Sequence, residues 1–305
     1  MKVEKSSFFV KSSDGYSLAV YSFLPLASKH ADRAPILVLP AMGVPGKFYV
    51  KTALLLANSG YPVYLQDLRG LGDSKPGPSK KNDFGYSKLI YDDCESVVEF
   101  LQERHSVEKV ILLGHSLGGQ LGAVYAGIHP ESIERLVLVT TAIPYYKLYG
   151  FPRSILYFCY YKFASLISSM LGYFPGDKLG AMGRNARQLM KDWSRIGLTG
   201  IFRDSGGSDL EWAFPRVTCP VLSVSFTDDQ TYAPRKPVEA FHGRMIGSTL
   251  AYLYLSPSDL EVKEVGHFGW MKNGKFSELV VAWLQNEVLR QPRNNDSQLV
   301  LETKH

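Results

Sequence analysis

Cysteine is scarce in this chain of 305 residues, and its three cysteines, Cys94, Cys159 and Cys219, lie far apart. Their positions do not match the short spacing of metal-ligand pairs, and three widely separated thiols do not make a disulfide framework. We therefore expect each of them to be a small, buried, apolar side chain in a reducing compartment, which indicates a cytoplasmic protein.

Long apolar runs are also lacking. The first residues, Met-Lys-Val-Glu-Lys-Ser-Ser, contain no apolar segment of the kind that a secretory signal requires. The most apolar long stretch, 154–171, contains Lys162 and several serines and is short for a membrane span. We interpret this stretch as a buried or groove-lining helix, with contact at a lipid interface as the alternative, and we expect no stable membrane insertion.

The chain has neither an arginine-rich run nor a strong excess of one charge. It contains 34 lysines and arginines against 29 aspartates and glutamates, and the formal net charge of +5 is scattered along the sequence. This distribution gives no reason to expect nucleic acid as a partner. The hydrophobic content of 45% and the charged content of 21% are ordinary for a globular protein.

Short apolar runs alternate with helical patterns in the first half of the chain and again after residue 215. Expected strands cover 8–10, 18–23, 35–39, 62–65, 110–113, 136–139, 220–226 and 250–255, and Asp14-Gly15 predicts a hairpin turn between the first two. Expected helices cover 47–58, 87–104, 117–129, 238–241 and 276–289. The strand runs are continuously apolar, which is typical of a mostly parallel sheet with helices on both faces.

The segment 142–215 breaks this alternation. It is rich in Tyr, Phe, Met and Trp, is interrupted by glycines, and shows helical runs at 154–171 and 186–195 but no strand pattern. We interpret it as a helical cap inserted into a single α/β core, which is formed by 1–141 and 216–290. Residues 291–305 are predicted to be a polar, mobile tail.

The residues Gly114-His115-Ser116-Leu117-Gly118 follow an apolar strand and precede a helical pattern. This is the G-x-S-x-G pattern of a nucleophile elbow, in which the serine occupies a sharp turn that only small neighbours permit. The turn exposes the Ser116 hydroxyl and directs the backbone N–H of Leu117 toward the place where an oxyanion would form. We assign the second N–H donor to Met42, in the loop after the first core strand.

A serine nucleophile needs a base, and the base needs an acid that orients it. His267 lies in a glycine-flanked loop after a strand pattern, and we predict it as the base. Asp228 and Asp229 both follow the strand 222–226, where open α/β sheets gather their sites. We favour Asp229 as the acid and keep Asp228 as the alternative. The remaining histidines are assigned to the interior of the elbow (His115), to a helix end (His129) and to the surface (His30, His105, His242 and His305).

These motifs together resemble the α/β-hydrolase superfamily over nearly the whole chain. Gly-His-Ser-Leu-Gly-Gly at 114–119 is similar to the elbow of that superfamily, and Gly266-His267-Phe268 is similar to its histidine loop. The run from Asp67 to Ser74 is similar to the D-x-R-G-x-G-x-S loop of members that resemble lipases, esterases and epoxide hydrolases. More narrowly, the segments 171–176, 192–193, 227–234 and 266–269 resemble a bacterial group of predicted hydrolases labelled serine aminopeptidase-like.

Two departures from the superfamily pattern matter. Pro40-Ala41 stands where the oxyanion loop usually has His-Gly, and the spacing from Asp229 to Pro234 is one residue longer than usual. The second departure is the reason for keeping Asp228 as an alternative.

The resemblance implies a serine hydrolase that cleaves a carboxylic ester or thioester through an acyl-serine intermediate, with no metal or organic cofactor. The aromatic and aliphatic content of the cap indicates an apolar acyl group in a small-molecule substrate. The alternatives are an acyltransferase that uses the same triad and a non-catalytic binding protein on the same fold. The oligomeric state is left open.

Overall fold

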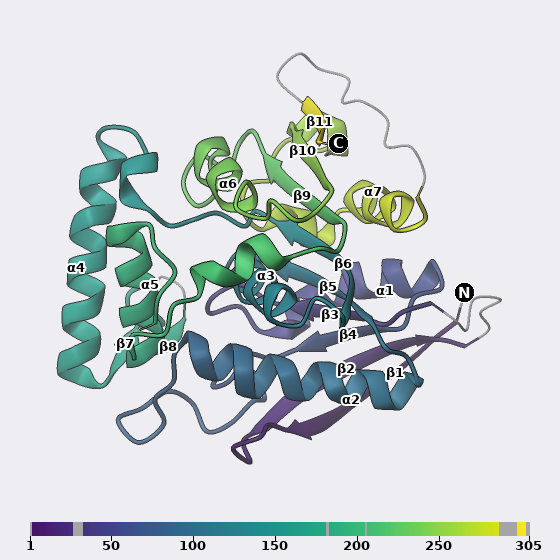
Figure 1. Cartoon of the computed structure of the whole chain (residues 1–305), viewed down its shortest axis with the longest axis horizontal. Coiled ribbons are helices and arrows are strands. Elements are labelled where there is room, and N and C mark those ends of the chain that lie inside the picture. Colours follow the sequence, from purple (N-terminus) through teal and green to yellow (C-terminus); the bar gives the residue numbers. More distant parts are fainter. Residues whose placement is uncertain (1, 27–32, 181–182, 205, 287–297, 303–305) are drawn as a thin grey trace.

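The computed structural model describes residues 2–26, 33–180, 183–204 and 206–286, together with the backbone of 298–302. Within these residues a central sheet of nine strands has the order β1-β2-β4-β3-β5-β6-β9-β10-β11 (Figure 1). The strands are β1 (Val3–Lys11), β2 (Ser17–Pro25), β3 (Ile36–Leu39), β4 (Val63–Gln66), β5 (Val110–His115), β6 (Ile133–Val139), β9 (Val221–Phe226), β10 (Leu250–Leu255) and β11 (Gln298–Glu302).

Strands β4, β3, β5, β6, β9 and β10 are parallel, and the edges of the sheet are antiparallel. The first two strands form the predicted hairpin, and Gly15 adopts a φ of +82° in its turn, a conformation that glycine adopts without strain. The mostly parallel sheet predicted from the continuous apolar runs is therefore confirmed.

Helices cover both faces of the sheet. The core helices are α1 (Val50–Asn58), α2 (Glu95–His105), α3 (Leu117–Ile128), α6 (Arg235–His242) and α7 (Gly274–Leu284). Residues of α2 and α3 share one apolar core with Leu37 and Leu112, whereas α1 and α7 share a second core with Val38 and Leu113. Because side chains alternate between the faces of a strand, continuously apolar strands supply both cores at once.

The segment between β6 and β9 contains two long helices, α4 (Arg153–Leu171) and α5 (Arg187–Thr199), which lie together at one side of the molecule (Figure 1). The expectation of no strands there is wrong, because β7 (Tyr173–Pro175) and β8 (Arg184–Ala186) form a small antiparallel sheet. Each of these strands has only three residues, too few to show a periodic pattern in the sequence.

Several expectations about individual residues are also wrong. Cys159 is exposed, since it lies on the outer face of α4, while the other two cysteines are buried. His242 is buried rather than on the surface, and its Nδ1 lies 3.0 Å from Ser223 Oγ. His105 is half-buried, with Nε2 2.6 Å from the Tyr64 hydroxyl. His30 and His305 lie outside the described residues.

The stretch 154–171 is helical as expected. Only three residues of α4 are buried, and four of its residues line a cavity, so of the two expected environments the groove-lining one is confirmed. Strand β11 pairs antiparallel with β10 inside the range predicted as a mobile tail, and the rest of 291–305 lies outside the described residues. Among the helices that the structure describes, none is long and apolar enough to cross a membrane.

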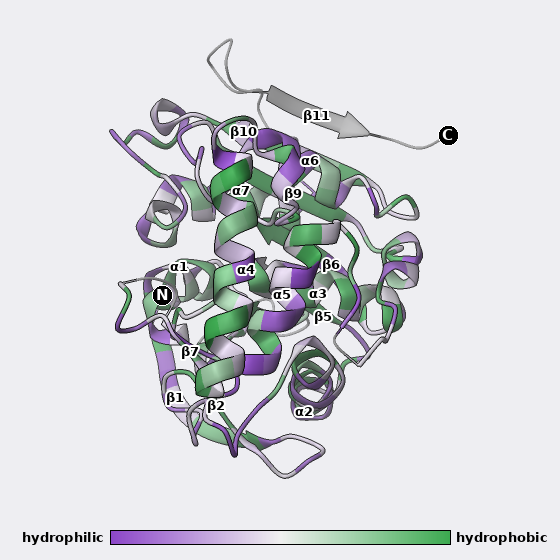
Figure 2. Ribbon diagram, turned by 90° about the vertical axis from the view of Figure 1, so that its left-hand side faces the viewer, coloured by the Kyte–Doolittle hydropathy of each residue, from purple (hydrophilic) through white to green (hydrophobic). Residues whose placement is uncertain are grey.

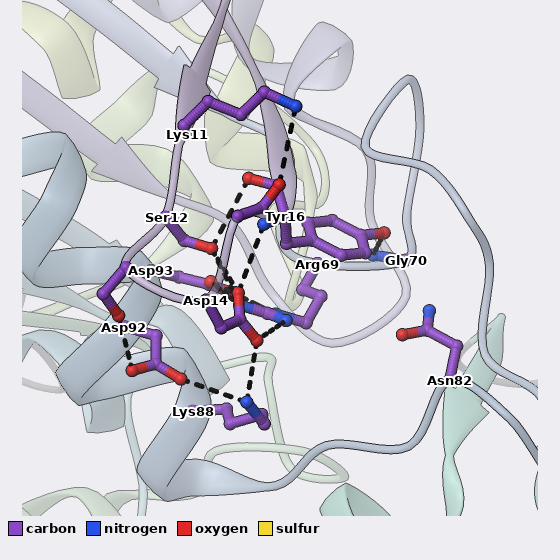
Figure 3. Close-up of polar contacts among 12 residues, drawn as sticks. Lys11, Ser12, Asp14, Tyr16, Arg69, Gly70, Asn82, Lys88, Asp92 and Asp93 are labelled. Atoms are coloured by element: carbon purple, nitrogen blue, oxygen red, sulfur yellow. Dashed lines mark hydrogen bonds and ion pairs between the residues drawn. The ribbon is translucent and has the colours of Figure 1, made fainter.

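A buried ion-pair network attaches the loop after β4 to the first hairpin (Figure 3). The Arg69 guanidinium donates to Asp14 at 2.7 Å and to Asp93 at 3.0 Å, and it lies over the ring of Tyr16. Asp67, in the same loop, accepts the backbone N–H of Gly46 at 2.6 Å. The run from Asp67 to Ser74 that resembles D-x-R-G-x-G-x-S thus has a structural role here, because Asp67 fixes the chain that follows the Met42 loop.

Candidate active site

Ser116 occupies a strained turn between β5 and α3. Its φ of +52° and ψ of −114° are rare for a residue with a side chain. A Cβ atom on Gly114 would overlap the Gly119 backbone, and one on Gly118 would overlap the Leu39 carbonyl group. The small neighbours predicted for the elbow are therefore a steric requirement of the observed turn.

His267 and Asp229 form a short contact beside the elbow. His267 Nδ1 lies 2.6 Å from Asp229 Oδ2, and both side chains are almost fully buried. Asp229 follows β9, and its second oxygen accepts the backbone N–H of Tyr232 at 3.0 Å. With Nδ1 engaged, the Nε2 atom of His267 is the ring nitrogen left to exchange a proton.

Asp228 makes different contacts. Its Oδ2 atom accepts the backbone N–H groups of Val265 at 2.8 Å and Gly266 at 3.0 Å. These two residues immediately precede His267, so Asp228 holds the histidine loop while Asp229 contacts the imidazole. The geometry thus favours Asp229 over Asp228 as the orienting acid.

Ser116 and His267 line the same cavity, which has a volume of about 310 Å³. The cavity lies between the carboxyl ends of the parallel strands and the α4–α5 segment. Most of its walls are aromatic or aliphatic, and the described residues that line it include no aspartate, glutamate, lysine or arginine. The remaining lining residues are Ala41, Met42, Leu117, Gln120, Thr140, Ala142, Pro144, Tyr149, Leu156, Tyr157, Tyr160, Tyr161, Trp193, Thr231, Tyr232 and Phe268.

A family profile described as alpha/beta hydrolase fold matches residues 34–165. An esterase from Exiguobacterium antarcticum superposes on the structure with a TM-score of 0.63 at 19% sequence identity, covering 92% of this chain and 100% of the esterase. The chain has the α/β-hydrolase fold.

Two curated proteins resemble shorter parts of the sequence. A probable alcohol acetyltransferase from Wickerhamomyces anomalus is 33% identical over 109 residues, which are 35% of this chain and 29% of that protein. Lipase member N from Homo sapiens is 25% identical over 143 residues, which are 42% of this chain and 36% of the lipase. The chain therefore spans about a third of the length of these curated relatives.

In this α/β-hydrolase fold the two residues predicted as oxyanion donors lie at the cavity wall next to Ser116. Leu117 is the first residue of α3, so its N–H has no acceptor within the helix. Within the described residues, the N–H of Met42 donates to no other group. Among the described residues, both amides are thus left without a backbone acceptor.

A buried tyrosine supports the Met42 loop through a contact that was not predicted from the sequence. The Tyr49 hydroxyl accepts the Ala41 N–H at 2.9 Å and lies 2.6 Å from His115 Nδ1. Burial raises the pKa of Tyr49 and lowers the pKa of His115 well below its usual range. Both groups are therefore neutral, and a hydrogen bond joins the hydroxyl to Nδ1. His115 is fully buried, as expected for the interior of the elbow, but its link to Tyr49 carried no signal in the sequence.

Tyrosine hydroxyls fasten the α4–α5 segment to the loop that carries Asp229. Tyr149 donates to the carbonyl of Tyr232 at 3.1 Å, and Tyr157 donates to that of Thr231 at 2.5 Å. Both tyrosines also line the cavity, so the same side chains form the wall of the site and hold the Asp229 loop. Among the described residues, no cluster of histidine, cysteine, aspartate and glutamate side chains could hold a metal ion.

Proposed function

We propose that this protein is a serine hydrolase that cleaves a carboxylic ester or thioester of an apolar acyl group. The observation that carries the proposal is the 2.6 Å contact between Asp229 and His267, in a cavity shared with Ser116 at a strained elbow. Ser116, Asp229 and His267 come from three separate loops at the carboxyl ends of parallel strands. Catalytic residues of this fold lie at that edge of the sheet.

In the proposed mechanism, Ser116 Oγ attacks the acyl carbonyl carbon and its proton passes to His267 Nε2. The carbonyl oxygen becomes an oxyanion that accepts hydrogen bonds from the amides of Met42 and Leu117. His267 then returns the proton to the leaving alcohol or thiol as the acyl-serine forms. A water molecule, deprotonated by His267, releases the acid. Asp229 keeps Nδ1 protonated and stabilises the imidazolium.

The cavity wall supports an apolar acyl group rather than a peptide amine. A substrate ammonium group buried in this site would need an opposite charge, and the described lining residues supply no carboxylate. The described part of the lining therefore offers the ammonium group of an aminopeptidase substrate no charged partner.

Acyl transfer is the second candidate, because the chain resembles a protein described as a probable alcohol acetyltransferase. The same residues would act, and an alcohol would replace water in the second step. Adding ethanol or a longer alcohol to the assay separates the two: a hydrolase releases mainly the free acid, whereas a transferase forms the new ester in preference to it.

The direct test is turnover of p-nitrophenyl esters of increasing acyl length. We expect hydrolysis with an optimum in chain length, and its loss in Ser116→Ala. Ser169→Ala, a matched change on the exposed face of α4, is expected to behave as the wild type. Folded wild-type protein without activity on any ester or thioester would overturn the proposal and favour a binding protein.

A further inference from the structure

The outward face of α4 is apolar along its whole length. Ile155, Phe163, Leu166 and Met170 have exposed fractions of 56%, 47%, 60% and 66%, and the thiol of Cys159 is exposed between them. Steps of three and four residues separate these positions, so they form one stripe along the helix. At 1.5 Å per residue the stripe runs for about 22 Å.

This stripe lies opposite the face that packs on the protein. Tyr161, Ala164 and Ser168 are buried against α5 and its surroundings. A surface helix normally carries charged residues on its outer face, but α4 has only Arg153 and Lys162. In Figure 2, α4 lies nearest the viewer and green, hydrophobic residues recur along it. A contiguous exposed patch of this kind marks an interaction site.

The charged residues of α4 and of the chain that flanks it in the sequence have one sign. Lys147, Arg153 and Lys162 are present, and no aspartate or glutamate occurs anywhere between Arg135 and Asp177. Apolar side chains flanked by lysine and arginine are typical of helices that lie in the headgroup region of an anionic membrane. A protein partner would need an acidic surface around an apolar groove, whereas an anionic bilayer offers both properties everywhere.

The stripe also continues into the mouth of the active-site cavity. Leu156 is 65% exposed and at the same time lines the cavity, and Tyr157 and Tyr160 on the same helix line it too. Phe151, just before α4, is 84% exposed. An apolar path therefore leads from the outer face of α4 to the cavity that holds Ser116.

We propose that α4 docks this protein on the surface of an anionic lipid membrane, with the stripe immersed among the acyl chains and the cations on the headgroups. The docking is peripheral, since none of the described helices is long and apolar enough to cross a bilayer. It follows, resting on the proposed function, that the substrates are acyl esters that enter the cavity from the lipid phase past Leu156.

The test is cosedimentation with vesicles of phosphatidylcholine containing phosphatidylglycerol. All proteins carry Ser116→Ala, so that binding is measured without turnover. We expect the combined change Ile155→Ser, Phe163→Ser and Leu166→Ser to weaken binding at least tenfold, because three apolar anchors are lost. None of these three residues lines the cavity.

A matched control changes three exposed apolar residues elsewhere, Phe9→Ser, Ile246→Ser and Val262→Ser, which are 61%, 57% and 40% exposed. This control is expected to bind vesicles as the parent does. Lys162→Gln should weaken binding about fivefold, and rising salt should weaken binding of the parent. Equal binding by the parent and the α4 variant would overturn the proposal, as would absence of vesicle binding by the parent.

Two further measurements separate this proposal from its competitors. If α4 instead packs against a second copy of the chain, sedimentation equilibrium will show a dimer for the parent and a monomer for the α4 variant, and the parent will not bind vesicles. That result overturns membrane docking. Turnover of a short, soluble ester by active protein with and without the α4 changes should be equal. Vesicle binding without ester turnover would leave docking supported and the proposed hydrolase wrong.

Discussion

Replacing Asp229 by asparagine should disable the site without unfolding it. The carboxylate contacts His267 Nδ1 at 2.6 Å and also accepts the Tyr232 N–H at 3.0 Å. The side chains of Asp229 and His267 are both almost fully buried. Asparagine keeps the shape but removes the charge, and its amide N–H₂ group favours the imidazole tautomer in which Nε2 carries the proton. A histidine in that tautomer cannot accept the proton of Ser116.

The expected loss is about 10⁴-fold in kcat, the size found when the acid of a Ser-His-Asp triad is changed in this way. That factor corresponds to about 5 kcal/mol of transition-state stabilisation. Asp228→Asn should lower kcat only about fivefold, which corresponds to about 1 kcal/mol of transition-state stabilisation. The loss is small because an amide oxygen still accepts the N–H groups of Val265 and Gly266. Asp228→Ala should cost more than Asp228→Asn, since it leaves both donors without a partner.

The assay is steady-state hydrolysis of a p-nitrophenyl ester by purified variants, with circular dichroism and thermal unfolding to show that each variant is folded. The reasoning fails if Asp228→Asn lowers kcat as much as Asp229→Asn does, since the roles of the two carboxylates would then be reversed or shared.

Three other changes test the fold around the site. Burial lowers the pKa of His242 to about 4, below the value of about 6.5 expected in the unfolded chain. The unfolded state therefore takes up the proton first as the pH falls, and about 3 kcal/mol of the free energy of unfolding present at about pH 7 is lost by about pH 4. Urea unfolding at several pH values should show this pH dependence, and the dependence should be smaller in His242→Gln. Gly118→Ala should lower stability by about 1–3 kcal/mol in thermal unfolding, because its Cβ would overlap a β3 carbonyl oxygen, whereas Gly150→Ala, which meets nothing within 4 Å, should be nearly neutral. Arg69→Met should lower the free energy of unfolding, measured by chemical unfolding, by about 3–5 kcal/mol, because the buried Asp93 loses its cation. A loss under about 1 kcal/mol would contradict a structural role for this ion pair.

The parts of the fold that follow from local rules were predictable. Ser116 between Gly114 and Gly118 is such a case, because the elbow restricts residue size at fixed positions whatever surrounds it. Continuously apolar strands likewise predict a sheet that is covered on both faces. Successive residues of β3 and β5 lie in different cores, one on each face of the sheet, which confirms this prediction.

Features that depend on the direction of a side chain were harder to predict. Asp228 and Asp229 are neighbours after one strand, and only the turn decides that one meets backbone amides while the other meets an imidazole. His242 was assigned to the surface from its polar neighbours. A usable signal existed, since Val238 lies four residues earlier and both face the protein interior.

The α4 segment shows why composition alone misleads. Its apolar residues predicted a buried or groove-lining helix, yet only Tyr161, Ala164 and Ser168 are buried, and one side of the helix lines the cavity while another is exposed. An apolar residue on a helix can face the core, a ligand or an external surface, and sequence periodicity does not distinguish these three environments. The lipid contact that was kept as an alternative for 154–171 thus becomes the basis of the proposed docking surface.

The most direct test of the central claim is covalent labelling with a fluorophosphonate, followed by mass spectrometry of the digested protein. We predict one phosphonyl adduct, located on Ser116, that is absent from Ser116→Ala and greatly slowed in Asp229→Asn. Folded wild-type protein that takes up no label, or that carries the label on another serine, would contradict the assignment of Ser116 as an activated nucleophile.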